Sequence, residues 1–288
     1  AGADFVKFQT FKADRMARPN VAKAAYQIKQ VGKDISQHAM LKSLELPEDW
    51  HHDLIDHAQA NGIGFISTAF DVASLNFLSV LDLPLFKIPS GELTNGPLLW
   101  RFAKTGKPLV LSTGMATLSE VEEALAVIAH ALTHDAQPDN RNAIWPAFSN
   151  PKAQAILQER VTLLHCTSQY PTPMDEVNLR SMGTLQSAFN LPVGYSDHTM
   201  GIHVPTAAVA LGACVIEKHI TTDRTLAGPD HAASLEPDEF TAMVAAIRGV
   251  SLAMGQAAKI PQASEWATRN VVRQRIVVAR ALSIGETI

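Results

Sequence analysis

Seven short apolar runs along the chain each end in a cluster of polar residues, and this pattern restricts the possible folds more than any other feature. The clusters occupy residues 7–10, 67–71, 87–92, 112–114, 165–168, 195–198 and 217–219. Continuous runs of Val, Ile, Leu and Phe are typical of parallel strands whose sheet is covered by helices. In a (β/α)8 barrel the catalytic groups lie at the carboxyl ends of several strands. The pattern therefore predicts an α/β barrel and an enzyme whose site lies at one end of its strands.

Segments with helix signals separate these runs, as a parallel α/β fold requires. Thr117 and Glu120 have the spacing of a capping box, which predicts a helix that continues to about Leu132. The alternation of strand and helix continues from residue 4 to about residue 255, which favours a parallel sheet. Residues 11–46 show little periodicity, and long loops in compact domains often form lids or binding loops. We expect this loop to lie over the mouth of the barrel.

The two ends of the chain resemble interior parts of a longer polypeptide. Residues 1–4 lead directly into a strand, and residues 276–279 resemble the start of a new one. We therefore divide the chain into a barrel domain (1–255), a linker (256–275) and the beginning of a further domain (276–288).

Composition and charge exclude several classes of protein. The net charge of −4 argues against an extended nucleic-acid surface. No stretch of the sequence approaches the ~18 consecutive apolar residues of a membrane span, and no signal peptide is visible. We therefore expect a cytoplasmic protein. Cys166 and Cys214 both lie within apolar runs, so we expect two buried free thiols and no disulfide.

His198 and His219 form the sharpest pair of candidate site residues. Each ends an apolar run, and the two runs are consecutive, so the two side chains can converge at the barrel mouth. Two imidazoles with open positions suit a divalent first-row metal, and Asp197, Glu217 and Asp230 are carboxylates that could bind it or orient a ring. The alternative is that each histidine is a hydrogen-bonded structural residue.

Lys7 and Lys87 stand in runs too apolar for a surface. Together with nearby hydroxyl groups and backbone amides, they can hold a phosphate or a carboxylate. Either lysine could instead form a Schiff base, or extend its ammonium group to solvent from a barrel end. Tyr170 could cap a substrate pocket or pack at the rim. The residues alone thus support a metal-assisted barrel enzyme for an anionic, phosphorylated substrate.

Seven motifs in order along nearly the whole chain resemble the N-acetylneuraminate (sialic acid) synthase family. They occupy residues 6–10, 86–92, 111–115, 170–171, 194–198, 217–219 and 228–240. The resemblance implies a (β/α)8 TIM barrel that here lacks its first strand, followed by the start of a C-terminal antifreeze-like (SAF) domain. It also implies a homodimer. The implied reaction condenses phosphoenolpyruvate with N-acetylmannosamine, or a related hexose derivative, to a nine-carbon sialic acid and phosphate.

The resemblance also implies roles for individual residues. His198 and His219 match the ligands of a divalent ion, with Mn²⁺ expected. Phosphoenolpyruvate contacts are expected from Lys87, Ser112 and Ser196, with Lys7 and Ser90 close by, and Ser168 is expected to contact substrate. Sugar contacts are expected from Gln9, Thr68, Glu92, Tyr170 and Asp230. Among these residues we take Lys87, Glu92 and Asp230 as catalytic.

Three alternatives stay open at the level of sequence. The same condensation could use the acceptor for legionaminic or pseudaminic acid, because the motifs above would barely change. A Schiff-base aldolase could use Lys87 or Lys7. A catalytically silent barrel could bind sugars or assemble with other proteins, although such a barrel has no need to keep the metal, phosphate and sugar residues together.

Overall fold

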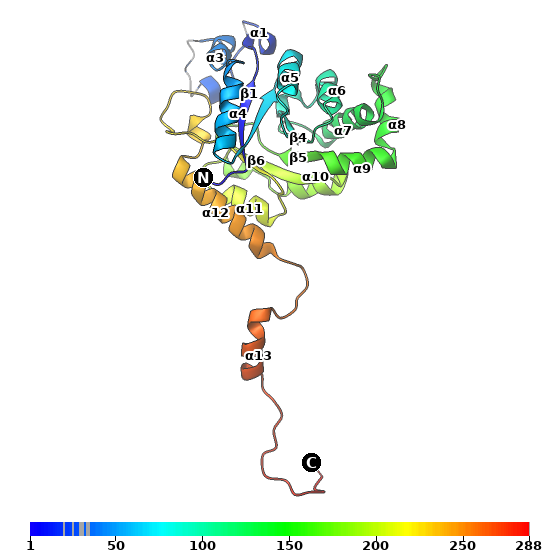
Figure 1. The fold of residues 1–288 in the computed structure, drawn as a ribbon, viewed down its shortest axis with the longest axis vertical. Coiled ribbons are helices and arrows are strands. Elements are labelled where there is room, and N and C mark those ends of the chain that lie inside the picture. Colours follow the sequence, from blue (N-terminus) through cyan, green and yellow to red (C-terminus); the bar gives the residue numbers. More distant parts are fainter. Residues whose placement is uncertain (20, 25, 29–31, 33–34, 288) are drawn as a thin grey trace. The chain divides into compact units, whose positions relative to one another are not determined.

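The computed structural model describes residues 1–19, 21–24, 26–28, 32 and 35–287 (Figure 1). It divides into two compact units, residues 1–253 and 254–288. The first unit contains the sheet and the candidate site.

Seven strands in the described residues form one sheet in which every neighbouring pair is parallel and the order follows the sequence. The strands are β1 (Phe5–Thr10), β2 (Gly64–Ala69), β3 (Phe86–Ile88), β4 (Leu109–Ser112), β5 (Val161–His165), β6 (Val193–Asp197) and β7 (Ile216–Lys218). Each of the seven polar clusters overlaps or directly follows one of these carboxyl ends. The expected parallel α/β sheet is therefore confirmed, strand by strand.

The sheet curls until side chains of its first and last strands meet. Lys7 Nζ on β1 lies 4.0 Å from Glu217 Oε2 on β7. In the described part of the chain, β1 and β7 nevertheless pair with one strand each, so each keeps one unpaired edge. That an eighth strand precedes the seven stays a prediction.

Helices connect the strands and lie around them in Figure 1. They are α1 (Ala13–Met16), α3 (Gln37–Ser43), α4 (Trp50–Ala60), α5 (Val72–Ser79), α6 (Gly96–Lys104), α7 (Leu118–Thr133), α8 (Trp145–Phe148), α9 (Pro151–Arg160), α10 (Ser181–Phe189), α11 (His203–Ala210) and α12 (Pro237–Met254), with 3-10 turns η1 (Ser90–Glu92), η2 (Arg141–Ile144), η3 (Met174–Glu176) and η4 (His231–Ala233). The predicted capping box is present: Thr117 accepts from the Glu120 amide, and Glu120 accepts from the Thr117 amide. The helix that it starts, α7, contributes nine buried residues to the core.

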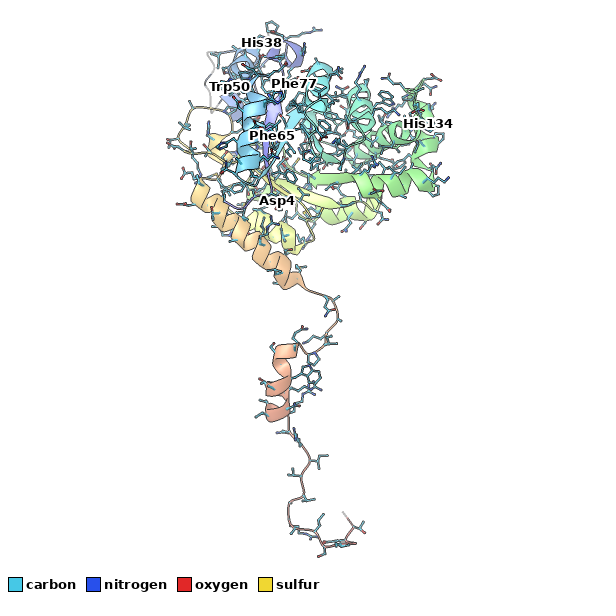
Figure 2. All side chains as sticks on the ribbon, in the orientation of Figure 1. Asp4, His38, Trp50, Phe65, Phe77 and His134 are labelled. Carbon is cyan, nitrogen blue, oxygen red and sulfur yellow. The ribbon has the colours of Figure 1, made fainter. Side chains whose placement is uncertain are left out.

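The core lies between the outer face of the sheet and these helices, and it includes one polar cluster. His51 on α4 is fully buried, and its Nε2 accepts from Thr10 Oγ1 at 2.8 Å. The ring packs edge-on against Phe65 and Phe77, which Figure 2 labels. Its Nδ1 donates to the Pro47 carbonyl at 3.1 Å, so both ring nitrogens have partners. This cluster attaches α4 to the back of β1.

One expectation from the sequence is wrong. Cys166 is buried as expected, but Cys214 is a free thiol that is exposed, because it lies in the turn that precedes the short strand β7. Residues 276–279 form no strand with the described residues, and Ile276 is fully exposed. A strand needs partners to be stable, and that this segment starts a strand of a further domain stays a prediction.

The second unit contains η5 (Ala263–Glu265) and α13 (Trp266–Val272). Several large apolar side chains of this unit are exposed, including those of Val271, Ile276 and Ile284. That residues 276–288 begin an antifreeze-like domain stays a prediction. Among the described residues of both units, no helix combines the length and the apolar character that crossing a membrane requires.

Candidate active site

The candidate site is built around Glu217, whose carboxylate lies inside the curled sheet between two lysines. Lys87 Nζ on β3 is 3.4 Å from Oε1, and Lys7 Nζ on β1 is 4.0 Å from Oε2. Ser196 on β6 donates to Oε1 at 2.8 Å. Four strands thus bring one anion, two cations and a hydroxyl group together at their carboxyl ends.

The charges in this cluster depend on one another. Burial alone would raise the pKa of the Glu217 carboxyl, but Lys7 and Lys87 outweigh burial and hold that pKa well below its usual range. Burial lowers the pKa of the Lys87 ammonium group, and Glu217 partly compensates. Two lysines thus face one carboxylate in this cluster, so its cationic groups outnumber its anionic one. An anionic ligand therefore meets an attractive field inside the barrel.

His198 and His219 lie beside this cluster with ring centroids 5.5 Å apart, so the structure brings the predicted pair together. His198 Nδ1 donates to the Thr167 carbonyl at 2.7 Å, which leaves Nε2 with a free lone pair. Burial is the main cause that lowers the pKa of both imidazoles. In His219, burial together with the nearby charge of Lys7 lowers the pKa to about 3. Both imidazoles are thus neutral at pH 7.

A neutral imidazole whose second nitrogen is fixed by a carbonyl is the form that binds a metal. The pair therefore fits two positions of a divalent-ion site. Asp230 lies nearby, with Oδ2 3.8 Å from His219 Nδ1. No cluster of three or more His, Cys, Asp or Glu side chains suited to a metal occurs among the residues that the structure describes, so further ligands would come from solvent or substrate.

Asp197 does not take part in this site, although it precedes His198. Lys218 Nζ donates to its Oδ2 at 2.6 Å, and the Thr199 amide and hydroxyl donate to its Oδ1. The suggestion that Asp197 could bind a metal or orient an imidazole is therefore wrong, because the side chain faces the opposite side of the sheet and its oxygens are engaged there.

Tyr170 covers the two histidines with its ring. Its centroid lies 4.0 Å from that of His198 and 5.6 Å from that of His219. Tyr26 packs against Tyr170, with the ring centroids 5.1 Å apart. Tyr26 belongs to the long segment of residues 11–46, so the described part of this segment does reach the site as expected. No periodic pattern in the sequence indicated Tyr26 itself.

Ser90 and Ser168, which were also expected near the substrate, lie beside Gly114. The Gly114 amide donates to Ser90 Oγ at 3.0 Å, and Cys166 Sγ lies 3.3 Å from the same oxygen. A Cβ atom at Gly114 would lie 2.4 Å from Ser168 Oγ. Only glycine therefore lets the backbone approach these three side chains.

Two buried hydroxyl groups in the site have no hydrogen-bond partner among the described residues. They are Ser112 Oγ at the end of β4 and Thr68 Oγ1 on β2. A buried polar atom without a partner costs free energy, so both are available to a ligand. Ser112 was expected to contact phosphoenolpyruvate and Thr68 to contact the sugar, and these roles stay predictions.

Gln9 and Glu92 are two further residues that were expected to contact the sugar. Gln9 is exposed and pairs in register with Thr68. Glu92 Oε2 accepts from Asn95 Nδ2 at 2.7 Å, next to the start of α6. Their expected roles in sugar binding, and the catalytic role of Glu92, stay predictions.

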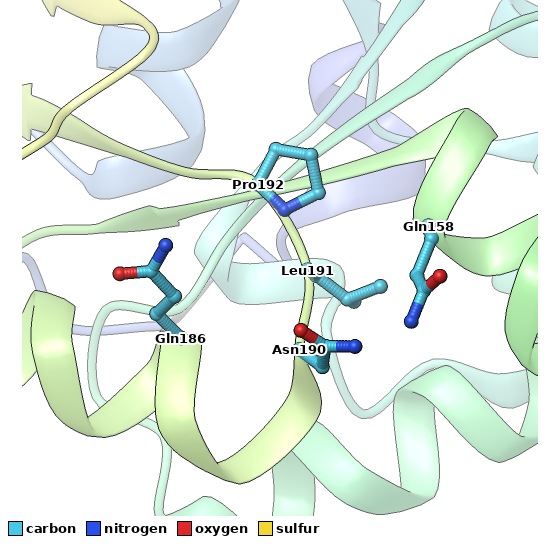
Figure 3. Close-up of a pocket in the computed structure, with 5 residues that line it drawn as sticks. All are labelled: Gln158, Gln186, Asn190, Leu191 and Pro192. Carbon is cyan, nitrogen blue, oxygen red and sulfur yellow. The ribbon is translucent and has the colours of Figure 1, made fainter. Parts of the chain in front are cut away.

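A separate hollow of about 350 Å³ lies near the opposite ends of the strands. Figure 3 shows its lining residues, which include Gln158, Gln186 and Asn190. Leu191 and Pro192 in its wall directly precede β6. The hollow has no charged lining residue, so the groups able to do chemistry are at the carboxyl ends of the strands.

A parallel α/β sheet with cations, neutral histidines and hydroxyl groups at its carboxyl ends is the arrangement of a barrel-type enzyme for an anionic substrate. Comparison with known proteins makes this more specific. The chain belongs to the NeuB family, whose model matches residues 1–259.

The similar proteins include synthases of N,N'-diacetyllegionaminic acid and of N-acetylneuraminic acid. The N,N'-diacetyllegionaminic acid synthase of Campylobacter jejuni is 46% identical over 99% of this chain and 79% of its own length. That of Legionella pneumophila is 44% identical over 100% of this chain and 75% of its length. A crystal structure of the N-acetylneuraminic acid (sialic acid) synthetase of Leptospira borgpetersenii, in complex with citrate, has a TM-score of 0.73 and 31% identity, and the match covers 95% of this chain and 83% of that chain.

Proposed function

We propose that the protein condenses phosphoenolpyruvate with an N-acetylated hexosamine to give a nine-carbon sialic-acid-type sugar and phosphate. The observation that carries this proposal is the pairing of an anion-attracting cluster, Lys7 with Lys87, and two neutral histidines in one site. The first suits the phosphate and carboxylate of phosphoenolpyruvate, and the second suits activation of an aldehyde.

Of the acceptors considered from the sequence, the relatives favour the alternative over the main expectation of N-acetylmannosamine. Two relatives at 46% and 44% identity are N,N'-diacetyllegionaminic acid synthases, whereas the sialic acid synthetase structure is 31% identical. Phosphoenolpyruvate contains no nitrogen, so both acetamido groups of a diacetylated product must come from the sugar. We therefore propose a hexose with two acetamido groups as the preferred acceptor.

The lysines and serines would hold phosphoenolpyruvate. Ammonium groups make strong charge-assisted hydrogen bonds to phosphate and carboxylate oxygens, and Lys7 and Lys87 already form ion pairs with the Glu217 carboxylate. Ser112 Oγ has no partner of its own among the described residues, and Ser196 Oγ lies beside Glu217. A bound phosphate or carboxylate would compete with Glu217 for the two lysines.

His198 and His219 would hold the divalent ion, expected to be Mn²⁺, which when bound supplies Lewis-acid polarisation of the sugar aldehyde. Burial raises the pKa of Asp230, although Lys7 and His231 oppose the effect. Asp230 thus keeps a proton to higher pH than an ordinary aspartate and can donate it to the alkoxide that forms from the aldehyde oxygen. Tyr170 packs against both histidine rings, tilted on His198 and edge-on to His219, and would exclude water from them.

In the first step the methylene carbon of the enol phosphate of phosphoenolpyruvate bonds to the aldehyde carbon of the sugar, and the aldehyde oxygen takes a proton. Water adds to the cationic carbon that carries the phosphate, with loss of a proton. The resulting tetrahedral intermediate then collapses with cleavage of the C–O bond, which releases phosphate and leaves the keto group of the product. A homodimer and a cytoplasmic location stay expectations beside this scheme.

The test measures phosphate released from phosphoenolpyruvate in the presence of a diacetamido hexose, N-acetylmannosamine or no acceptor, each with Mn²⁺ and with chelator. We expect acceptor-dependent release that chelation abolishes, with a higher kcat/KM for the diacetamido hexose. Higher kcat/KM for N-acetylmannosamine would reverse the choice of acceptor. Absence of release with every acceptor would overturn the proposed reaction, and trapping of pyruvate on a lysine by borohydride would favour the Schiff-base aldolase.

A further inference from the structure

Strands β6 and β7 carry a buried ion pair on the side of the sheet away from the site. Lys218 Nζ lies 2.6 Å from Asp197 Oδ2, and both side chains are 0% exposed. Asp197 Oδ1 accepts from the Thr199 amide at 3.0 Å and from its hydroxyl at 2.8 Å. Lys218 also donates to the Thr199 carbonyl. The pair thereby joins both strands and the loop after β6.

The residues next to this pair are the ones that form the site. Asp197 lies opposite Lys218 in the strand register, and Ser196 lies opposite Glu217. Successive side chains of a strand point to opposite faces of the sheet. Because Asp197 and Lys218 face away from the site, their neighbours face into it. On that side Ser196 bonds to Glu217, and the next residues along the two strands are His198 and His219.

Strand β7 is short, and the backbone contacts around it are few: the Tyr195 amide donates to the Val215 carbonyl before the strand, and an isolated parallel bridge joins Ile220 to Leu235 after it. The strand is three residues long, Ile216–Lys218, and pairs only with β6 among the described strands. Slipping by one residue would exchange its two faces. Lys218 would then enter the site, while Glu217 and His219 would leave it.

The pair is poorly explained by stability alone. Two charges lose their hydration when they are buried, and apolar residues of similar volume at such places are often equally or more stabilising. We propose that Asp197 and Lys218 are positioning residues that fix the register of β7 on β6 and so hold Glu217 and His219 opposite Ser196 and His198. The catalytic consequence of this inference rests on the proposed function, but the register itself does not.

The main test removes both charges at once, with Asp197→Leu and Lys218→Met combined, so that no unpaired charge stays buried. We expect a folded protein whose Mn²⁺ affinity, measured by calorimetric titration, falls about 10- to 100-fold, as for other residues that orient metal ligands. We expect kcat for phosphate release to fall as well. A crystal structure of this double variant should show β7 shifted, or His219 displaced from His198.

Three further variants make the result decisive. Lys218→Arg keeps a cation and should keep Mn²⁺ affinity within about threefold, since the ion pair is retained. Asp197→Asn keeps the side-chain volume and weakens the pair, which serves if the double variant does not fold. Leu157→Ala, in the buried face of α9, is the matched control for lost stability and should leave Mn²⁺ affinity unchanged.

Wild-type register and wild-type Mn²⁺ affinity in the double variant, or in Asp197→Asn if only that variant folds, would overturn the inference. Failure of the proposed function would look different. In that case the wild-type protein would release no phosphate, while the crystal structures would still report whether the register of β7 depends on the pair.

Discussion

Glu217 and the two lysines beside it show how far a single residue can alter this site. Lys87 is 4% exposed and lies 3.4 Å from the Glu217 carboxylate. Its removal would leave Glu217 with the more distant Lys7 alone, 4.0 Å away. The positive field that attracts an anion would then be lost, since one cation and one anion cancel.

We therefore predict that Lys87→Met raises the KM for phosphoenolpyruvate about 10- to 100-fold. One lost hydrogen bond to a charged group costs about 1.5–3 kcal/mol, and each 1.4 kcal/mol is about tenfold. Steady-state phosphate release measures the change. Lys107→Met is the control, because Lys107 pairs with Asp82 at the surface at 2.7 Å. An unchanged KM in Lys87→Met would remove Lys87 from the phosphoenolpyruvate site.

A second residue-scale prediction concerns His51 and pH. Burial lowers the pKa of His51 below its usual value of about 6.5, and the neutral ring accepts from Thr10. Above about pH 6.5 the ring is neutral whether the chain is folded or unfolded, so its full contribution to stability is present. As the pH falls below this value, the unfolded chain takes up a proton that the folded chain refuses, and the contribution is lost.

Urea unfolding of the wild type and of His51→Gln between pH 5 and pH 8 tests this account. We expect the wild type to be more stable by about 1–3 kcal/mol near pH 8, the cost of disturbing a buried hydrogen bond. The difference should shrink as the pH falls toward 5. A difference that stays constant or grows on acidification would show that His51 is not held neutral in the folded protein.

At the scale of elements, helix α7 depends on its start. Its capping box satisfies two backbone amides that no helical carbonyl can reach. Thr117→Ala should therefore lower the free energy of unfolding by about 0.5–2 kcal/mol. Chemical denaturation measures this loss. Thr117→Ser, which retains the hydroxyl, should recover most of the loss.

The elements also show what could be predicted from sequence. The strands were predictable because each is an apolar run with a polar end, and α7 was predictable because its capping box is local. That the Glu217 side chain points to the same side of the sheet as His219 was predictable, because the two residues are two positions apart on one strand. The same alternation turns Asp197 away from its neighbour His198, but its partner could not be predicted, because Lys218 lies 21 positions away. Tyr26 was missed because the loop that carries it has no periodic pattern.

At the scale of the whole first unit, one ion pair joins segments far apart in the sequence. Arg248 Nη2 on α12 lies 2.6 and 2.7 Å from the two carboxylate oxygens of Asp4, just before β1. Both side chains are more than half exposed. Exposed pairs contribute little because water and salt screen them.

Arg248→Ala should therefore lower the free energy of unfolding by at most about 1 kcal/mol. The loss should shrink further in 1 M salt, where the Debye length is only about 3 Å. Urea titrations at low and high salt measure both effects. A loss well above this value that is independent of salt would mean that Arg248 contributes mainly through packing of its aliphatic chain.

If the 288 residues are expressed by themselves, the edge of β1 that has no partner among the described residues affects their behaviour in solution. A row of free amide and carbonyl groups can accept another extended chain as a template, and Phe5, 43% exposed on β1, adds an apolar contact at this edge. Association through such an edge needs no unfolding. We therefore expect concentrated samples of this polypeptide to scatter more light before their circular dichroism changes, with loss of monomer set by protein concentration rather than by temperature.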